Sequence, residues 1–457
     1  MYNGIRFTNS SDIEQILNTA LKVLAQVGVL VESAELECLL LQKGRGKLAL
    51  IDGRIVIDPC FAEAVFLSGS GRAQDPSVSA FAEIYEGWYL DPRSGAYETW
   101  TESRLLSYIK LAQKLEHVGQ ASMLGCPLPG ISLMEKPLYE KLWCFSYGLA
   151  CGGSIWDTRL CEPIYEIWRA YARERQEDPG AIFSGTVYLL TPLRFGHVEA
   201  EQYLWFYNHG LQVGIGTLAS IGLSVPVTPA GAIAEQLAEQ LFVGCVQSIL
   251  FGTEGFALSS GLSVADPRTS AFQYGRPEQV LMNNAIADIA DHYGLACHLH
   301  CGLSDAKLPS YEAGVQKLGS ALSAFLKGRE GHIAAGLLSV DEVCSPVQMV
   351  LDNEAAGYLK RLQKGFGVDE EALAYQVIAD GSAMPIELEH TVRNMRENIW
   401  NPRLFSSEMY SGWQQSGLSA EDKARDQALA IMEGGDPEIR ISDRCRGEIL
   451  KIIQKVR

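Results

Sequence analysis

From about Thr101 onward the chain repeats one pattern, a short apolar run followed by a longer amphipathic segment. Thr228 and Pro229 open one of the amphipathic segments and Gly294 ends another, as expected of helix termini. Alternating strands and helices predict a parallel sheet covered by helices. Seven units, with an eighth strand that the pattern does not locate, favour a (β/α)8 TIM-like barrel over an open α/β sheet. The apolar runs predicted to be strands are 119–126, 148–156, 181–190, 211–219, 255–262, 295–302 and 331–338.

The first hundred residues follow a different pattern. Two helical segments precede alternating residues on either side of Asp52-Gly53, which is a strong hairpin signal, and a second hairpin is expected within 86–100. The tail of the chain is amphipathic and helical. We therefore expect an N-terminal α+β cap at 1–100, a TIM-like barrel at 101–400 and a C-terminal helical extension at 401–457.

Composition excludes several classes of partner. The net charge of −17 argues against nucleic acid and anionic membranes, because both attract proteins rich in Lys and Arg. The 11 cysteines have no regular spacing, so a secreted disulfide framework is not expected. The N-terminus does not have the pattern of a signal peptide, and no run is long enough to span a bilayer. These features predict a cytoplasmic protein, and they leave open whether it forms a homo-oligomer.

The segment 295–307 contains two cysteines and two histidines within five positions. Successive side chains of a strand point to opposite faces, so His298 and His300 share one face while Cys297 and Cys301 share the other. A tetrahedral zinc site needs about four converging ligands, so no metal site is predicted. The alternative is a two-histidine metal site, completed from elsewhere, in a barrel hydrolase or lyase.

Polar residues at the end of this strand and in the loop after it lie where barrel enzymes have their active sites, at the carboxyl ends of the strands. His300 and His298 are candidates for the pocket wall, and Lys307 is a candidate for binding a substrate carboxylate. Asp305 has two readings that weigh about equally: it attracts a cation, or it caps the helix that begins near Pro309.

Aromatic residues near strand ends supply a second set of candidates. Ring faces attract quaternary ammonium groups through cation–π interaction, worth about 0.5–2 kcal/mol per ring. Several rings must converge to form a cage, which the sequence alone does not establish. Besides Asp305, Asp266 is a second acidic candidate, either to balance the charge of the substrate or to order its own loop. The aromatic candidates for substrate binding are Trp156, Tyr188, Phe272 and Tyr274.

Several blocks of the chain together resemble one known family: 27–33, 224–240, 266–282, 292–318, 345–362 and 388–413. The combination of blocks is similar to the trimethylamine methyltransferase (MttB-like) superfamily and extends over nearly the whole chain. The resemblance implies a TIM-like barrel and transfer of a methyl group from a methylated amine to the Co(I) corrinoid of a separate small protein. The chain has no D-x-H-x-x-G corrinoid-binding motif, so the partner is expected to supply the corrinoid.

The chain also departs from that family. Trimethylamine-specific members carry pyrrolysine, whereas this sequence has only standard residues, which favours the branch acting on quaternary amines, with glycine betaine as the first candidate. Ser406 and Ser407 stand where the family pattern leads one to expect an Arg nearby. No catalytic residue is assigned. A further alternative is a quaternary-amine binding protein without catalytic activity.

Overall fold

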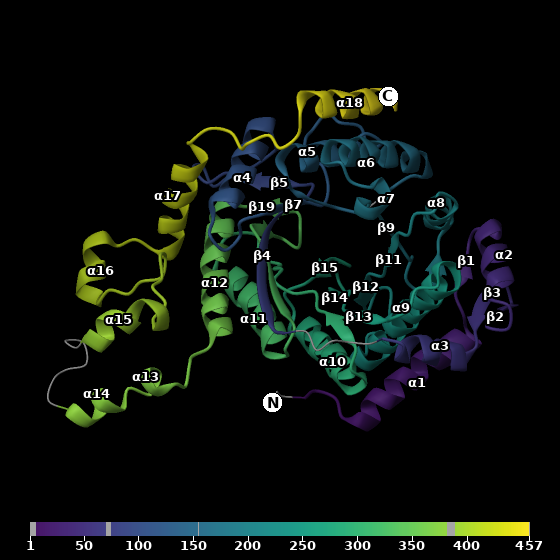
Figure 1. Ribbon diagram of the computed structural model, residues 1–457, viewed down its shortest axis with the longest axis horizontal. Coiled ribbons are helices and arrows are strands. Elements are labelled where there is room, and N and C mark those ends of the chain that lie inside the picture. The colour runs from purple at the N-terminus through teal and green to yellow at the C-terminus, as the bar shows by residue number, and fades with distance from the viewer. Residues whose placement is uncertain (1–5, 70–74, 154, 382–388, 457) are drawn as a thin grey trace.

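The computed structural model describes residues 6–69, 75–153, 155–381 and 389–456 and has an α/β architecture. Most of its short strands lie inside a ring of helices (Figure 1). Among the described residues, no helix combines the length and apolar character that a bilayer crossing requires.

Parallel strands occupy the inside of the ring. They are β4 (Ser77–Ile84), β7 (Ala121–Met123), β8 (Ala150–Cys151), β9 (Thr186–Tyr188), β11 (Gly214–Gly216), β12 (Ala219–Ile221), β13 (Ala257–Ser259), β14 (Leu262–Ala265), β16 (Ala296–His298) and β17 (Glu330–Ala335). The long helices that follow these strands are α4 (Glu102–Lys114), α5 (Lys136–Tyr147), α6 (Cys161–Arg175), α8 (His197–Asn208), α9 (Pro229–Phe251), α10 (Pro277–Tyr293), α11 (Tyr311–Leu326) and α12 (Pro346–Lys364).

Backbone hydrogen bonds connect these strands in chain order and return to the first. Parallel pairs join β17 to β4, β4 to β7, β7 to β8, β9 to β11, β12 to β14 and β13 to β16. Two amides complete the series: Thr186 donates to Gly153 across β8 and β9, and Ala334 donates to Gly302 across β16 and β17. Each of the seven predicted runs overlaps at least one of these strands.

If β11 with β12 and β13 with β14 are each counted as one interrupted strand, the ring has eight strands. The eighth is β4, in the part of the chain expected to form a separate cap. It pairs along six residues with β17, from Ser77 opposite Glu330 to Ala82 opposite Ala335. Strand pairing therefore crosses the boundary predicted at residue 100. β4 ends just before the predicted hairpin, which forms as β5 (Trp88–Leu90) and β6 (Tyr97–Glu98).

The N-terminal segment packs against the outside of the ring. It comprises α1 (Ser10–Gln26), β1 (Leu30–Val31), α2 (Ala34–Lys43), β2 (Leu48–Ile51), β3 (Arg54–Ile57) and α3 (Pro59–Leu67). The hairpin predicted around Asp52-Gly53 is confirmed as β2 and β3. Helices α1 and α3 both contact α9. Apolar residues along the inner face of α1, including Ile13, Leu17 and Leu24, are buried there.

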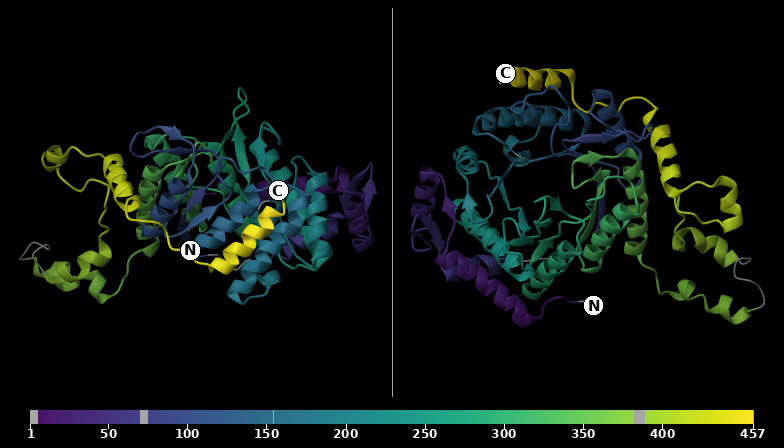
Figure 2. Two further views of the ribbon diagram at one scale, coloured as in Figure 1. Left: turned by 90° about the horizontal axis from the view of Figure 1, so that it is seen from above. Right: turned by 180° about the vertical axis from the view of Figure 1, so that it is seen from behind.

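The chain ends in helices that extend from the ring and then return to it. They are α13 (Glu370–Leu373), α14 (Tyr375–Asp380), α15 (Glu389–Asn398), α16 (Tyr410–Ser416), α17 (Ala420–Met432) and α18 (Asp443–Gln454). Helix α17 packs against α4 and α12, and α18 packs against α5 and α6, where its yellow ribbon crosses blue helices in Figure 2. The remaining short elements are η1 (Thr158–Leu160), α7 (Pro179–Ile182), β10 (Arg194–Phe195), β15 (Phe272–Gln273), β18 (Leu337–Leu338) and β19 (Val343–Cys344).

A buried ion pair fixes the carboxyl end of β17. The Lys317 Nζ of α11 lies 2.7 Å from Asp352 Oδ2 of α12 and donates to the carbonyl oxygens of Ala334 and Leu337. The same Asp352 oxygen accepts the Gly336 amide at 2.8 Å. Both charges thus have several partners, which a buried pair needs in order to offset the cost of desolvation.

Replacing Lys317 with Met should lower the free energy of unfolding by about 3–5 kcal/mol, because Asp352 would be left charged and buried without its partner. Urea denaturation measures the loss. Arg93→Gln is the matched control, since it breaks an ion pair with Glu433 whose side chains are 62% and 63% exposed and should cost less than about 1 kcal/mol. Similar small losses in both variants would contradict the structural role given to Lys317.

Candidate functional site

Polar side chains occupy the inner face of β4 and β17. Ser79 Oγ lies 2.8 Å from His332 Nδ1, and Glu83 Oε1 lies 3.1 Å from His332 Nε2. An ionised carboxylate can only accept a hydrogen bond, so in the neutral imidazole Nε2 carries the hydrogen and the Ser79 hydroxyl donates to Nδ1. The ring of His332 also packs 5.5 Å from that of Phe81. These contacts fix the orientation of Glu83 within the ring of strands.

His300 lies close to this group. Burial lowers the pKa of His300 to about 4; Glu83 opposes the shift, whereas His298 and His332 add to it. The imidazole is therefore neutral at pH 7. Its Nδ1 is buried and has no hydrogen-bond partner among the described residues, and its ring meets the Tyr274 ring at 4.8 Å in an edge-to-face contact.

Tyrosines and a carboxyl group gather beyond His300. Burial raises the pKa of Tyr274 to about 12, with further contributions from Asp341, Tyr85 and Tyr188. The pKa of Tyr85 is raised first by burial and then by Asp341. Burial also raises the pKa of Asp341. These mutual effects indicate that the three phenols and the carboxyl group are electrostatic neighbours near the carboxyl ends of β4 and β9. Neutral phenol rings beside a carboxyl group favour a cation that carries methyl groups.

Asp305 holds Tyr274 in place. Its carboxylate oxygens accept the amide of Tyr274 at 2.7 Å and the amide of Gly275 at 3.0 Å. The reading of Asp305 as a helix cap is wrong, because Ser310 is the N-cap of α11. Lys307 is exposed, and its Nζ donates to the Asp305 carbonyl oxygen at 2.8 Å.

Asp266 likewise accepts backbone amides, in the turn after β14. It accepts the amides of Arg268 and Thr269, and the guanidinium of Arg268 lies 3.4 Å away. The hydrogen bond from the Arg268 amide is the main reason that the pKa of Asp266 is lowered. The Asp266 carboxylate thus orders the turn that leads into β15.

The other predicted residues lie at separate places. His298 is on the inner face towards the amino ends of the strands, with Nδ1 3.9 Å from Glu330 Oε2, beside a cavity of about 220 Å³. Phe272 lies in β15 with 54% of its surface exposed, and Trp156 follows β8 with 39% exposed. Of the nine candidates, the structure brings Tyr188, Tyr274, His300 and Asp305 into one neighbourhood.

The two cysteines beside the histidines are buried on the opposite side of the strand. Cys297 and Cys301 are each 2% exposed, whereas His298 is exposed on the inner face. The alternation expected from the sequence is confirmed, and the four side chains do not converge. No three His, Cys, Asp or Glu side chains within the described parts of the chain are arranged to hold a metal ion.

Sequence reasoning missed Glu83, His332, Tyr85 and Asp341. The signal for Glu83 and Tyr85 was the alternating run from Ser77 to Tyr85, which was not counted as a ring strand. His332 lies inside a predicted strand, whereas barrel polarity directs the search for site residues to the ends of strands. Asp341 lies in the turn between β18 and β19, where the sequence has no marker for proximity to Tyr274.

The low pKa of His300 makes stability depend on pH. The unfolded imidazole binds a proton near pH 6.5 and the folded one only near 4, so the neutral form contributes stability above pH 6.5 that is lost as the pH falls towards 4. A His300→Asn variant should lose less stability over this interval than the wild type, by at most about 3 kcal/mol. Urea denaturation at pH 7, 6, 5 and 4 measures the difference. The exposed His197→Asn variant is the control, and a pH profile like that of His197→Asn would contradict a buried neutral His300.

Comparisons of the sequence with a family model and with known proteins agree on one family. The model of the trimethylamine methyltransferase (MTTB) family matches residues 150–440. Glycine betaine methyltransferase of Desulfitobacterium hafniense is 29% identical over 259 residues, which are 55% of this chain and 54% of that protein. The trimethylamine methyltransferase MttB of Methanosarcina barkeri is 28% identical over 257 residues, which are 55% of this chain and 52% of that protein.

A solved structure is also similar over most of the chain. It is the Methanosarcina barkeri monomethylamine methyltransferase, with 10% identity and a TM-score of 0.48 over 94% of this chain and 88% of that one. In sequence, the chain spans about half the length of the curated relatives that it matches. The family match alone covers more than half of the chain, from β8 through α17. The chain belongs to the trimethylamine methyltransferase (MTTB) family.

Proposed function

We propose that the ring of eight strands is a (β/α)8 TIM-like barrel extending from β4 through α12, with α1–α3 and α13–α18 as additions outside it. The closed series of parallel pairs supports this architecture. In such a barrel the active face lies at the carboxyl ends of the strands. Tyr85 and Tyr188 lie at those ends and Tyr274 directly follows β15. His298 is the last residue of β16, but its side chain lies beside Glu330, the first residue of β17.

The function that fits this face best is methyl transfer from a methylated amine to a corrinoid carried by a separate protein. The observation that carries the proposal is the set of three tyrosine rings near Asp341, a carboxyl group that also interacts with Glu83. A quaternary ammonium cannot donate an N–H hydrogen bond, so ring faces and nearby negative charge are the means by which a protein binds it. Family membership and the relatives that act on glycine betaine and trimethylamine support the same reaction class.

The reaction balances without a proton donor. The carbon–nitrogen bond of the methyl donor breaks, and its electron pair stays on nitrogen, which leaves as a neutral amine. The Co(I) acceptor supplies the electron pair of the new bond to the methyl carbon. The chain has to align one methyl group with the acceptor and exclude water, which is catalysis by positioning. Asp305 contributes indirectly, because it holds Tyr274.

Glycine betaine is the first donor that we propose. Its carboxylate needs a hydrogen-bonding partner, and the unpartnered Nδ1 of the neutral His300 is buried beside Tyr274. The sequence contains only standard residues, which supports the branch of the family without pyrrolysine. His298 and Lys307 serve this donor less well, since His298 is near Glu330 and Lys307 donates to a main-chain oxygen.

The direct test combines the purified chain, a Co(I) corrinoid protein and a panel of glycine betaine, carnitine, proline betaine, choline and trimethylamine. Loss of the Co(I) absorption with one quaternary amine is the expected result. If none of the five changes the spectrum beyond a control without the chain, the proposed function is wrong. Stoichiometric zinc in the purified protein would instead favour the alternative of a metal-dependent hydrolase or lyase at His298 and His300.

Glu83→Gln should reduce kcat/KM by about 10- to 100-fold, mainly through KM, because a charged partner of the ammonium is lost. The amide oxygen of Gln can still accept from His332 Nε2, so the fold should be retained. Steady-state kinetics with the active donor and near-ultraviolet circular dichroism measure the two effects. The exposed Glu116→Gln variant is the matched control. Unchanged kinetics in Glu83→Gln would remove Glu83 from the proposed site.

A further inference from the structure

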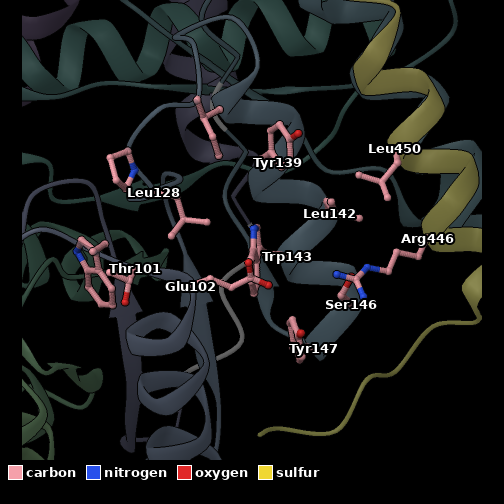
Figure 3. Close-up of a pocket in the computed structure, with 13 residues that line it drawn as sticks. Thr101, Glu102, Leu128, Tyr139, Leu142, Trp143, Ser146, Tyr147, Arg446 and Leu450 are labelled. Carbon is pink, nitrogen blue, oxygen red and sulfur yellow. The ribbon is translucent and has the colours of Figure 1, made fainter.

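A second pocket lies on the outer wall, away from the inner face of the ring. It is a cavity of about 440 Å³ between the start of α4, the side of α5 and the last helix, α18. We call it the α5–α18 pocket. Figure 3 shows its side chains, of which the argument uses Trp100, Glu102, Trp143, Ser146, Tyr147 and Arg446. All residues lining this pocket lie outside residues 150–440, the segment shared with the family.

Three buried polar atoms in this pocket have no hydrogen-bond partner among the residues that the structure describes: Ser146 Oγ, Arg446 Nε and Trp100 Nε1. Ser146 is 2% exposed and Trp100 is 1% exposed, so bulk water does not satisfy them. Unpaired buried polar groups cost about 1–3 kcal/mol each, and in native proteins they usually have a partner. Two of these atoms are N–H donors and the third is a hydroxyl. The partner that would satisfy them is an acceptor.

Charge is distributed unevenly across the pocket. Figure 3 shows Arg446 reaching from α18 towards Ser146, while Glu102 lies on the other side, next to Trp143. No carboxylate in the described residues forms an ion pair with the Arg446 guanidinium. Burial raises the pKa of Tyr147, Arg446 opposes the rise and Glu102 adds to it, so both charges act on the same part of the pocket.

The remaining wall is apolar or aromatic. Trp143 and Tyr147 stack with ring centroids 5.4 Å apart along α5. Leu128 and Ile131 come from the loop after β7, and Leu450 comes from α18. A site with an apolar body and a few convergent polar groups is typical of small-molecule binding.

We propose that the α5–α18 pocket binds a small monocarboxylate with an apolar or aromatic body. The carboxylate accepts from Arg446 and Ser146, and the body lies against Trp143 and the leucines. A second negative charge on the ligand would meet Glu102, so a dicarboxylate of similar size is disfavoured. Because the ligand contacts both α5 and α18, its binding ties the C-terminal helix to the ring.

Isothermal titration calorimetry of the full chain with 3-phenylpropionate tests the proposal, with no corrinoid protein or amine present. Saturable binding is expected. The neutral 3-phenylpropionamide and the dicarboxylate phenylsuccinate should each bind at least about tenfold more weakly. Tryptophan fluorescence gives a second readout, since Trp100 and Trp143 line the pocket.

Two variants locate the binding. Arg446→Gln should weaken 3-phenylpropionate binding about tenfold or more, because a charge-assisted hydrogen bond is lost. Ser146→Ala removes a hydroxyl that has no hydrogen-bond partner in the described part of the chain, so it should weaken binding without loss of stability. Arg444→Gln, on an exposed position of the same helix, should bind like the wild type.

No saturable binding, or equal binding of acid and amide, would overturn the proposal. Binding that is unchanged in both Arg446→Gln and Ser146→Ala would also overturn it, because the ligand would then lie elsewhere. These outcomes are independent of methyl transfer, since no reacting component of that assay is present.

Discussion

The arrangement of the inner face depends on one strand, β4, which pairs with β17 on one side and β7 on the other. Without it the parallel series would have two free edges, one at the start and one at the end of the chain order. Its pairing with β17 joins residues about 250 positions apart, as in the bond between Ser79 and His332. The same strand carries Glu83 and Tyr85. Closure of the ring and assembly of the candidate site are therefore one structural event.

The carboxyl ends of the strands are held by buried charges rather than by apolar packing alone. Lys317 and Asp352 fix the backbone after β17, and Lys141 of α5 donates both to Glu140 and to the carbonyl oxygen of Gly152 after β8. Such pairs cost desolvation energy and are a poor route to stability. Their advantage is geometric, because each lysine binds main-chain oxygens at a defined place. The loops that carry polar groups start from these fixed points.

Local signals in the sequence predicted the elements that depend on local physics. Thr228 is the N-cap residue of α9, although its side chain makes no capping hydrogen bond, and Gly294 ends α10 in the left-handed conformation expected of a C-cap glycine. The seven strands predicted from short apolar runs also form. The place of β4 in the ring was not predicted, because its short alternating run precedes a hairpin and looks like part of the cap. Only its pairing with β17 shows that it is a strand of the ring.

The site was predictable to the extent that strand alternation and strand ends determine it. Alternation separated His300 from Cys301, and barrel polarity pointed to Tyr188 and Tyr274. The role of Asp305 was not predictable, because it depends on amides 30 and 31 positions away in the chain. The same holds for Asp341 and Tyr274, whose proximity follows from the closed ring and leaves no local pattern.

The selectivity that we propose for a cation rests on the inner face and not on the net charge of −17. Exposed charges are screened beyond a Debye length of about 8 Å at physiological ionic strength, whereas buried ones are screened much less. Burial favours the protonated form of Asp341, and a cation bound beside it favours the ionised form. Neutral phenols nearby can donate hydrogen bonds to the carboxylate as it becomes charged. A methylated ammonium at this place would thus supply the positive charge that the buried Asp341 carboxyl group lacks. His300 stays neutral, so it does not compete with the ammonium as a cationic partner of Asp341.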